Sequence, residues 1–92
     1  MNTIHPAVPL TPGNMREIID MTWPHRASWK LIGIDLGIDI GTLDAIEKDR
    51  RIVQDCLSEL ISTWLRKTDP RPMRATMSAV LDSKHIINAE GS

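Results

Sequence analysis

The stretch that decides the fold is Trp29-Lys30-Leu31-Ile32-Gly33-Ile34-Asp35-Leu36-Gly37-Ile38, followed at once by Thr42-Leu43-Asp44-Ala45-Ile46-Glu47. Its apolar residues recur at helical spacing. Ser28 stands where it can cap a helix that runs to about Leu36, and Gly37 falls at the position just past its end, where glycine ends many helices. The first half of the stretch therefore predicts a short amphipathic helix that ends at a glycine turn.

The second half predicts another short helix. Asp39 is placed to cap it, Leu43 and Ile46 form its buried side, and it ends near Lys48. Apolar periodicity then continues outward in both directions, and no segment alternates with period two for long enough to predict a strand. The chain is therefore expected to be all-α, with five or six short helices and short connections.

Upstream, the prolines of residues 1–13 predict an extended lead-in. Residues 14–92 are expected to form a single domain. Pro12 suits a first helical turn, while Asn14 and Glu17 resemble a capping box. The apolar face of this helix is made of Met15, Ile18, Ile19 and Met21 to Trp23. Pro24 closes the helix, because the residue before a proline is pushed out of the helical region.

Downstream, a longer helix is expected to open at Asp49 or Arg50 and to end near Leu65. Its apolar positions come in pairs every four residues and predict a central helix with neighbours on both sides. These positions are Ile52, Val53, Cys56, Leu57, Leu60, Ile61, Trp64 and Leu65. Residues 69–72 break the helix, and a last one follows with Met73, Met77, Val80 and Leu81 on one face. After Ser83 the apolar period of a further helix is missing.

Composition excludes several classes of function. The chain has 92 residues, a formal net charge of −1 and one cysteine, Cys56, which is expected to be a buried apolar side chain. The histidines are scattered, no glycine-rich loop follows a strand, and no dry cleft of paired carboxylates is indicated. We therefore expect no enzymatic activity, metal, cofactor, small-molecule substrate or inserted membrane segment. The absence of a signal-peptide pattern and of a disulfide framework predicts a cytoplasmic protein.

The spacing of Gly33, Gly37, Leu43 and Ile46 satisfies the requirements of a DNA-binding helix-turn-helix, which is one interpretation. That spacing reports how closely two helices cross, and a DNA-reading helix also needs basic or amide side chains on its exposed side. Residues 35–47 contain four acids and no base. Because an acidic face repels the phosphate backbone, DNA binding is kept only as the alternative, and no nucleic-acid partner is expected.

Three blocks of sequence, in order and at matching spacing, resemble the death-domain family. The block Trp29-x-x-Ile32-Gly33-x-x-Leu36-Gly37-Ile38 is similar to its second helix, and Leu43-Asp44-Ala45-Ile46-Glu47 to its third. Val53-Gln54-Asp55-Cys56-Leu57 through Trp64-Leu65-Arg66 is similar to its long fourth helix. The resemblance runs from about Asn14 to Ser83. It departs at Met73-Arg74, where the family often has a Thr-Trp pair, and in the early end of the chain.

The resemblance implies an antiparallel six-helix death-fold bundle whose sixth helix is short or absent here. It also implies a non-catalytic adaptor that binds other death domains, of its own or another kind, and assembles oligomers in apoptotic or innate-immune signalling. In that family, helix 3 and the corner between helices 4 and 5 recur as interface positions. Contacts between two unlike patches build open assemblies, so concentration-dependent oligomers are expected.

Charges of opposite sign are segregated along the chain, and they supply candidate partner-binding residues. The acidic set is Asp35, Asp39, Asp44 and Glu47, and the basic set is Arg66, Lys67, Arg71 and Arg74. A further basic cluster is Lys48, Arg50 and Arg51. Leu31 is expected to point outward as a partner-binding hydrophobe, while Trp23, Trp29 and Trp64 are assigned to the core.

Overall fold

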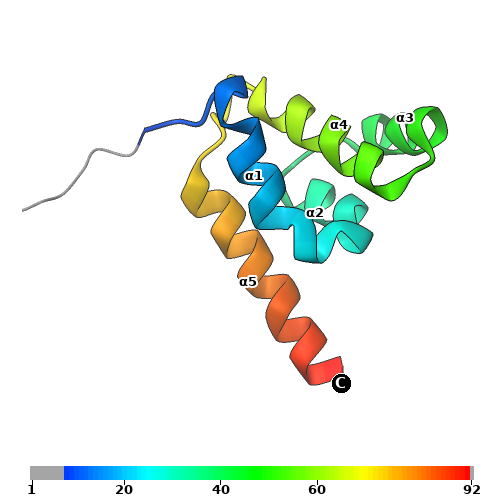
Figure 1. Cartoon of the computed structure of the whole chain (residues 1–92). Helices are drawn as coiled ribbons and strands as arrows, with labels where there is room; N and C mark the ends of the chain where they lie inside the picture. The colour runs from blue at the N-terminus through cyan, green and yellow to red at the C-terminus, as the bar shows by residue number, and fades with distance from the viewer. Residues whose placement is uncertain (1–7, 92) are drawn as a thin grey trace, which may run out of the picture.

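The computed structural model describes residues 8–91, with side chains up to Ser83. In this part of the chain it is an all-helical bundle (Figure 1), as the sequence predicts. Its α-helices are α1 (Met15–Thr22), α2 (Trp29–Asp35), α3 (Ile40–Arg50), α4 (Val53–Leu65) and α5 (Arg74–Gly91). Two 3-10 helices, η1 (Pro12–Asn14) and η2 (Trp23–Ser28), precede and follow α1. Residues 1–7 of the predicted lead-in, and Ser92, lie outside the described residues.

The core is centred on α4, which packs against α1, α2 and α3. Its predicted stripe is confirmed from Cys56 onward, because each of its apolar residues there is buried: Cys56, Leu57, Leu60, Ile61, Trp64 and Leu65. The helix begins later than predicted, at Val53, because α3 continues through Arg50 and Arg51 turns the chain with a positive φ of 67°. Ile52 and Val53, placed on the stripe from sequence, precede the packed turns and are exposed.

The crossing of α2 with α3 depends on Gly33. A Cβ atom at this position would lie 2.6 Å from a Leu43 methyl carbon and 3.0 Å from one of Leu60. Both leucines are fully buried, so this space does not exist for a side chain. The small residue that the sequence pattern requires midway along the helix is thus explained by contact with two neighbouring helices.

Gly37 ends α2 in the manner predicted. Its φ is +83°, in the left-handed region that glycine adopts without strain. The Ile38 N–H donates to the Gly33 carbonyl at 2.9 Å and the Gly37 N–H to the Ile34 carbonyl at 3.0 Å, which is the Schellman arrangement. Asp39 caps α3 as predicted, accepting from the Thr42 N–H at 3.2 Å. Ser28 occupies the N-cap position of α2, but its side chain makes no capping hydrogen bond.

The start of the helical region differs from the prediction by one turn. The capping box is formed by Thr11 and Asn14 around η1, with Pro12 in its first turn, rather than by Asn14 and Glu17. Asn14 instead donates from its side chain to Glu17 at 3.4 Å. The extra turn arises because the hydroxyl of Thr11, a residue with an extended backbone, accepts the Gly13 N–H at 3.2 Å and donates to the Asn14 side-chain oxygen at 3.3 Å.

The assignment of Trp23 to the core was wrong, whereas Trp29 and Trp64 are buried. Trp23 keeps helical dihedrals but lies five positions after the buried Ile18, off the buried side of the helix, and is 41% exposed. Thr22 occupies the buried position instead, and its hydroxyl donates to the Ile18 carbonyl at 2.9 Å. The Arg26 guanidinium stacks over the Trp23 ring, 4.8 Å from its centroid.

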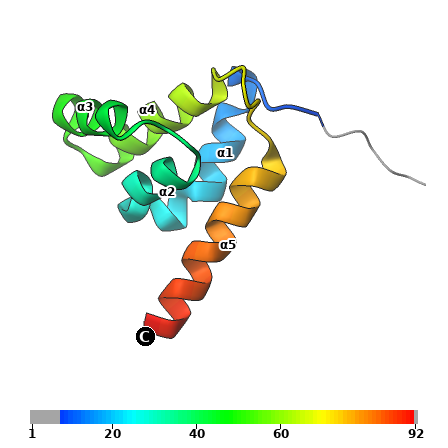
Figure 2. The same ribbon diagram turned by 180° about the vertical axis from the view of Figure 1, so that it is seen from behind.

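The last helix is longer than the sequence indicates. Met77, Val80 and Leu81 form its buried face, as predicted, but α5 continues to Gly91. No sixth helix follows within residues 8–91. Residues 74–90 contain neither proline nor glycine, so nothing in the backbone ends the helix where its apolar pattern fades. In both views the C-terminal half of α5 extends past the other helices (Figures 1 and 2).

Candidate protein-interaction surfaces

The predicted acidic residues come from two neighbouring elements, α2 and α3. We call Asp35, Asp39, Asp44 and Glu47 the acidic face; all four are exposed. Leu31 is 54% exposed and Ile34 47% exposed. Leu31, Ile34 and Asp35 are spaced i, i+3, i+4, so they share one side of α2. Ile40, at the start of α3, is 54% exposed. The prediction that Leu31 points outward is confirmed, and it is one of several exposed apolar side chains beside these acids.

Lys30, which the sequence analysis passed over, lies among these acids. Its ammonium is 2.7 Å from the Asp44 carboxylate and 2.9 Å from that of Glu47. These hydrogen bonds raise the pKa of Lys30 above its ordinary value, and the one with Asp44 has the larger effect. Asp44 and Glu47 are therefore tied to α2 as well as open to solvent. No sequence signal links Lys30 to residues more than ten positions away.

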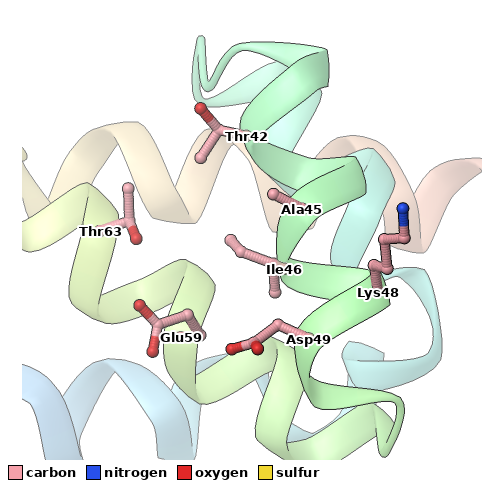
Figure 3. Close-up of a pocket in the computed structure, with 7 residues that line it drawn as sticks. All are labelled: Thr42, Ala45, Ile46, Lys48, Asp49, Glu59 and Thr63. Atoms are coloured by element: carbon pink, nitrogen blue, oxygen red, sulfur yellow. The ribbon is translucent and has the colours of Figure 1, made fainter.

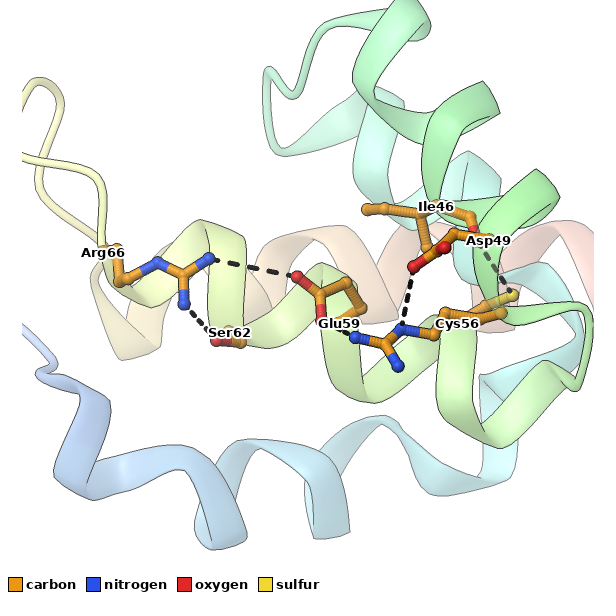
Figure 4. Close-up of polar contacts among 7 residues, drawn as sticks. Ile46, Asp49, Cys56, Glu59, Ser62 and Arg66 are labelled. Atoms are coloured by element: carbon orange, nitrogen blue, oxygen red, sulfur yellow. Dashed lines mark hydrogen bonds and ion pairs between the residues drawn. The ribbon is translucent and has the colours of Figure 1, made fainter.

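The predicted basic residues separate into two groups. Arg66, Lys67 and Arg71 line one groove after the end of α4, and we call these three the basic corner. Lys67 and Arg71 form no ion pair with any residue that the structure describes. Arg66 donates to the Ser62 hydroxyl at 2.7 Å and lies 4.0 Å from the Glu59 carboxylate (Figure 4).

Arg74 does not join the basic corner. Its guanidinium makes two hydrogen bonds to Glu17, one of them 2.8 Å long, and so ties the start of α5 to α1. The hydrogen bond from Arg74 lowers the pKa of the Glu17 carboxyl below its ordinary value. The interpretation of Arg74 as a surface contact residue overlooked Glu17, which lies 57 positions away in the sequence.

The third basic cluster, Lys48, Arg50 and Arg51, is not one surface either. Arg50 pairs with Glu59 at 3.1 Å and lies 3.6 Å from Asp49. Lys48 lines an open groove of about 510 Å³ between α3 and α4, shared with Thr42, Ala45, Ile46, Asp49, Glu59 and Thr63 (Figure 3). Because Arg50 already neutralises Glu59, this groove is a mixed surface with no strong charge of either sign.

Cys56 is buried beside this groove, as predicted. Its thiol faces the Ile46 carbonyl at 4.0 Å (Figure 4). Burial raises the pKa of the thiol, which disfavours the reactive thiolate. Among residues 8–83, no group of three or more His, Cys, Asp or Glu side chains is placed to hold a metal ion. Within residues 8–91, no helix combines the length and apolar character of a membrane span.

The acidic face and the basic corner lie toward opposite ends of α4. Figure 1 shows α3 beside the start of α4 and the loop after Leu65 at its far end. The helix has 13 residues and so spans roughly 20 Å. No family model, curated protein or solved structure matches this chain.

Proposed function

We propose that this protein is a death domain that binds other domains of its kind, its own copies included, through surfaces of opposite charge. The observation that carries the proposal is the acidic face with its exposed Leu31, Ile34 and Ile40. Apolar side chains ringed by charge are typical of protein interfaces, where the apolar centre supplies affinity and the charged rim selects the partner. The death-fold arrangement of the helices, and a role as a cytoplasmic adaptor in apoptotic or innate-immune signalling, are part of this proposal.

The positions of the two surfaces support head-to-tail association. If the acidic face of one copy binds the basic corner of the next, the pair keeps one unused surface of each kind, one on each copy. Such a heterologous contact does not close on itself in a dimer and continues into rings or open helical assemblies. Charge complementarity between the surfaces mainly sets the rate of association and the choice of partner.

The same acidic face argues against the alternative of DNA binding. In a helix-turn-helix, α3 would enter the major groove, but its exposed side carries Asp44 and Glu47. The close crossing at Gly33, which suggested that alternative, is explained by packing against Leu43 and Leu60. A gel-shift with random duplex DNA at low salt is expected to show no retardation.

The test of the proposal is a pair of charge-reversed variants. We expect Arg66→Glu/Arg71→Glu to weaken self-association by roughly tenfold or more, measured by sedimentation velocity. We expect Asp35→Lys/Asp44→Lys, on the acidic face, to weaken self-association to a similar extent. Each variant keeps one intact surface, and the two reversed surfaces are complementary to each other in charge, so a mixture of the two variants should associate again. At about 1 M salt, where the screening length falls to about 3 Å, association of the unmodified protein should also weaken.

The matched control for the basic-corner variant is Arg16→Glu/Arg26→Glu, which changes the net charge by the same amount at exposed residues outside both surfaces. It should associate like the unmodified protein. Far-UV circular dichroism checks that all variants keep their helices. If the mixture of the two reversed variants stays monomeric, or if the control loses association as strongly, the head-to-tail contact is wrong.

A further inference from the structure

A second binding site is formed where the start of the chain passes the loop after α4. A groove of about 670 Å³ runs between residues 8–12 on one side and residues 65–68 and 71–72 on the other. Both views show this early segment beside the loop (Figures 1 and 2). The two sides are joined by a hydrogen bond from the Leu10 N–H to the Pro72 carbonyl, 2.8 Å long, and by the buried side chain of Leu10.

The charge of this groove is of one sign. Its lining contains the whole basic corner, Arg66, Lys67 and Arg71, and no acidic residue. By contrast, the groove between α3 and α4 is lined by Asp49 and Glu59, and a third groove by Asp55 and Glu59. In a chain whose formal net charge is −1, Lys67 and Arg71, which pair with no described acid, are a local excess of positive charge in this groove, together with Arg66, which lies 4.0 Å from Glu59. A ligand that fits this groove is therefore an anion.

The shape and the apolar surfaces of the groove narrow the class of anion. It is lined by five consecutive residues of the early segment, 8–12, and so follows a stretch of chain several residues long. Pro9, Pro12 and Pro72 add apolar surface along it, together with Leu65. None of its lining residues is aromatic, so it has no platform on which nucleic-acid bases stack. An extended peptide with alternating acidic and apolar side chains matches both the cations and the apolar walls.

We propose that this groove binds a short extended acidic peptide segment of a partner protein. The site goes beyond the proposed function, because it needs no second folded domain. Its cations are also those of the basic corner, so a bound peptide and a second copy of the domain exclude each other there. Such a segment is then a competitive inhibitor of head-to-tail association.

The experiment is a fluorescence anisotropy titration of the full chain into a labelled hexapeptide of alternating glutamate and leucine. We expect saturable binding that weakens as salt is raised. A matched peptide with glutamine in place of glutamate should bind at least tenfold more weakly. Thr68→Glu adds an acid to the groove at an exposed position and leaves the three cations in place. It should reduce binding of the acidic peptide about tenfold, whereas Thr76→Glu, exposed on α5 outside the groove, should not.

Equal binding of the two peptides, or an unchanged affinity of Thr68→Glu, would overturn the proposal. So would co-sedimentation with phosphatidylserine vesicles in the absence of any peptide binding, since that result would assign the cations to an anionic lipid surface. Peptide binding and self-association are separate measurements. A chain that binds the peptide but stays monomeric contradicts only the proposed function, and one that associates but ignores the peptide contradicts only this site.

Discussion

The two ends of α4 are held together in different ways. At the α3 end, the decisive contacts join residues close in sequence: Gly33 packs on Leu43, and Asp39 caps its own helix at Thr42. At the far end, they join residues from opposite ends of the chain, Leu10 with Pro72 and Glu17 with Arg74. Contacts between residues close in sequence produce a spacing pattern that can be recognised in the sequence. Contacts between opposite ends of the chain produce no such pattern. The two ends should therefore also respond differently to substitution.

The largest expected effect is at the α3 end. Gly33→Val places a branched side chain where a Cβ alone meets Leu43 at 2.6 Å, so α2 must move away from α3 and α4. We expect a loss of about 2–3 kcal/mol in the free energy of unfolding, measured by urea denaturation. Because α2 and α3 carry the acidic face, association through that face should also be lost.

Substitutions of Gly37 are the control that distinguishes a steric clash of the side chain from strain in the backbone. A Cβ there meets nothing within 4 Å, but φ is +83°. Gly37→Ala should cost about 1–2 kcal/mol through left-handed strain, and Gly37→Asn less, because asparagine tolerates that region. If Gly33→Val proved as stable as Gly37→Asn, the close crossing would not be the reason for glycine at position 33.

The next effect concerns the far end. Leu10 is 4% exposed and holds the early segment against the loop. We expect Leu10→Ala to lower the free energy of unfolding by about 2 kcal/mol, at the low end of the range for buried leucines, because a segment near the chain start can partly collapse. It should also loosen the groove and weaken peptide binding. The matched control is Val8→Ala, which removes methyl groups from a side chain that is 68% exposed and should leave the free energy of unfolding unchanged.

This difference between the ends sets how much the sequence could predict. The existence and order of the α-helices, the turn at Gly37, the Asp39 cap and the buried stripe from Cys56 to Leu65 follow from spacing and were predicted correctly. The register around Trp23 could also have been predicted, because positions 18 and 22 are one helical turn apart and 23 is not. Thr22 stood within the predicted apolar face, and its hydroxyl can be buried because the Ile18 carbonyl accepts its hydrogen bond.

The contacts at the candidate surfaces that the sequence did not reveal have another physical cause. Arg74 was grouped with the other basic residues because it is near Arg71 in sequence. In the structure its guanidinium instead forms hydrogen bonds with the carboxylate of Glu17, which is distant in sequence. Lys30 was missed among the acids for the same reason. The later start of α4 follows the positive φ of Arg51, a conformation that arginine disfavours, and α5 reaches Gly91 because residues 74–90 contain no proline or glycine. No apolar period records either feature.

The smallest effect tests the Glu17–Arg74 pair through pH. The hydrogen bond from Arg74 lowers the pKa of Glu17, so the charged form is favoured in the folded protein. Its contribution to stability is therefore present above the ordinary pKa of 4.5 and is lost as the pH falls through the lowered value. We expect Glu17→Gln to melt slightly below the unmodified protein at pH 7 and together with it under strongly acidic conditions. Asp20→Asn, an exposed change on the same helix at a residue that pairs with no described cation, should show no such convergence. A melting difference that stays constant across the acid range would mean that the contact of α1 with α5 depends on packing and not on this ion pair.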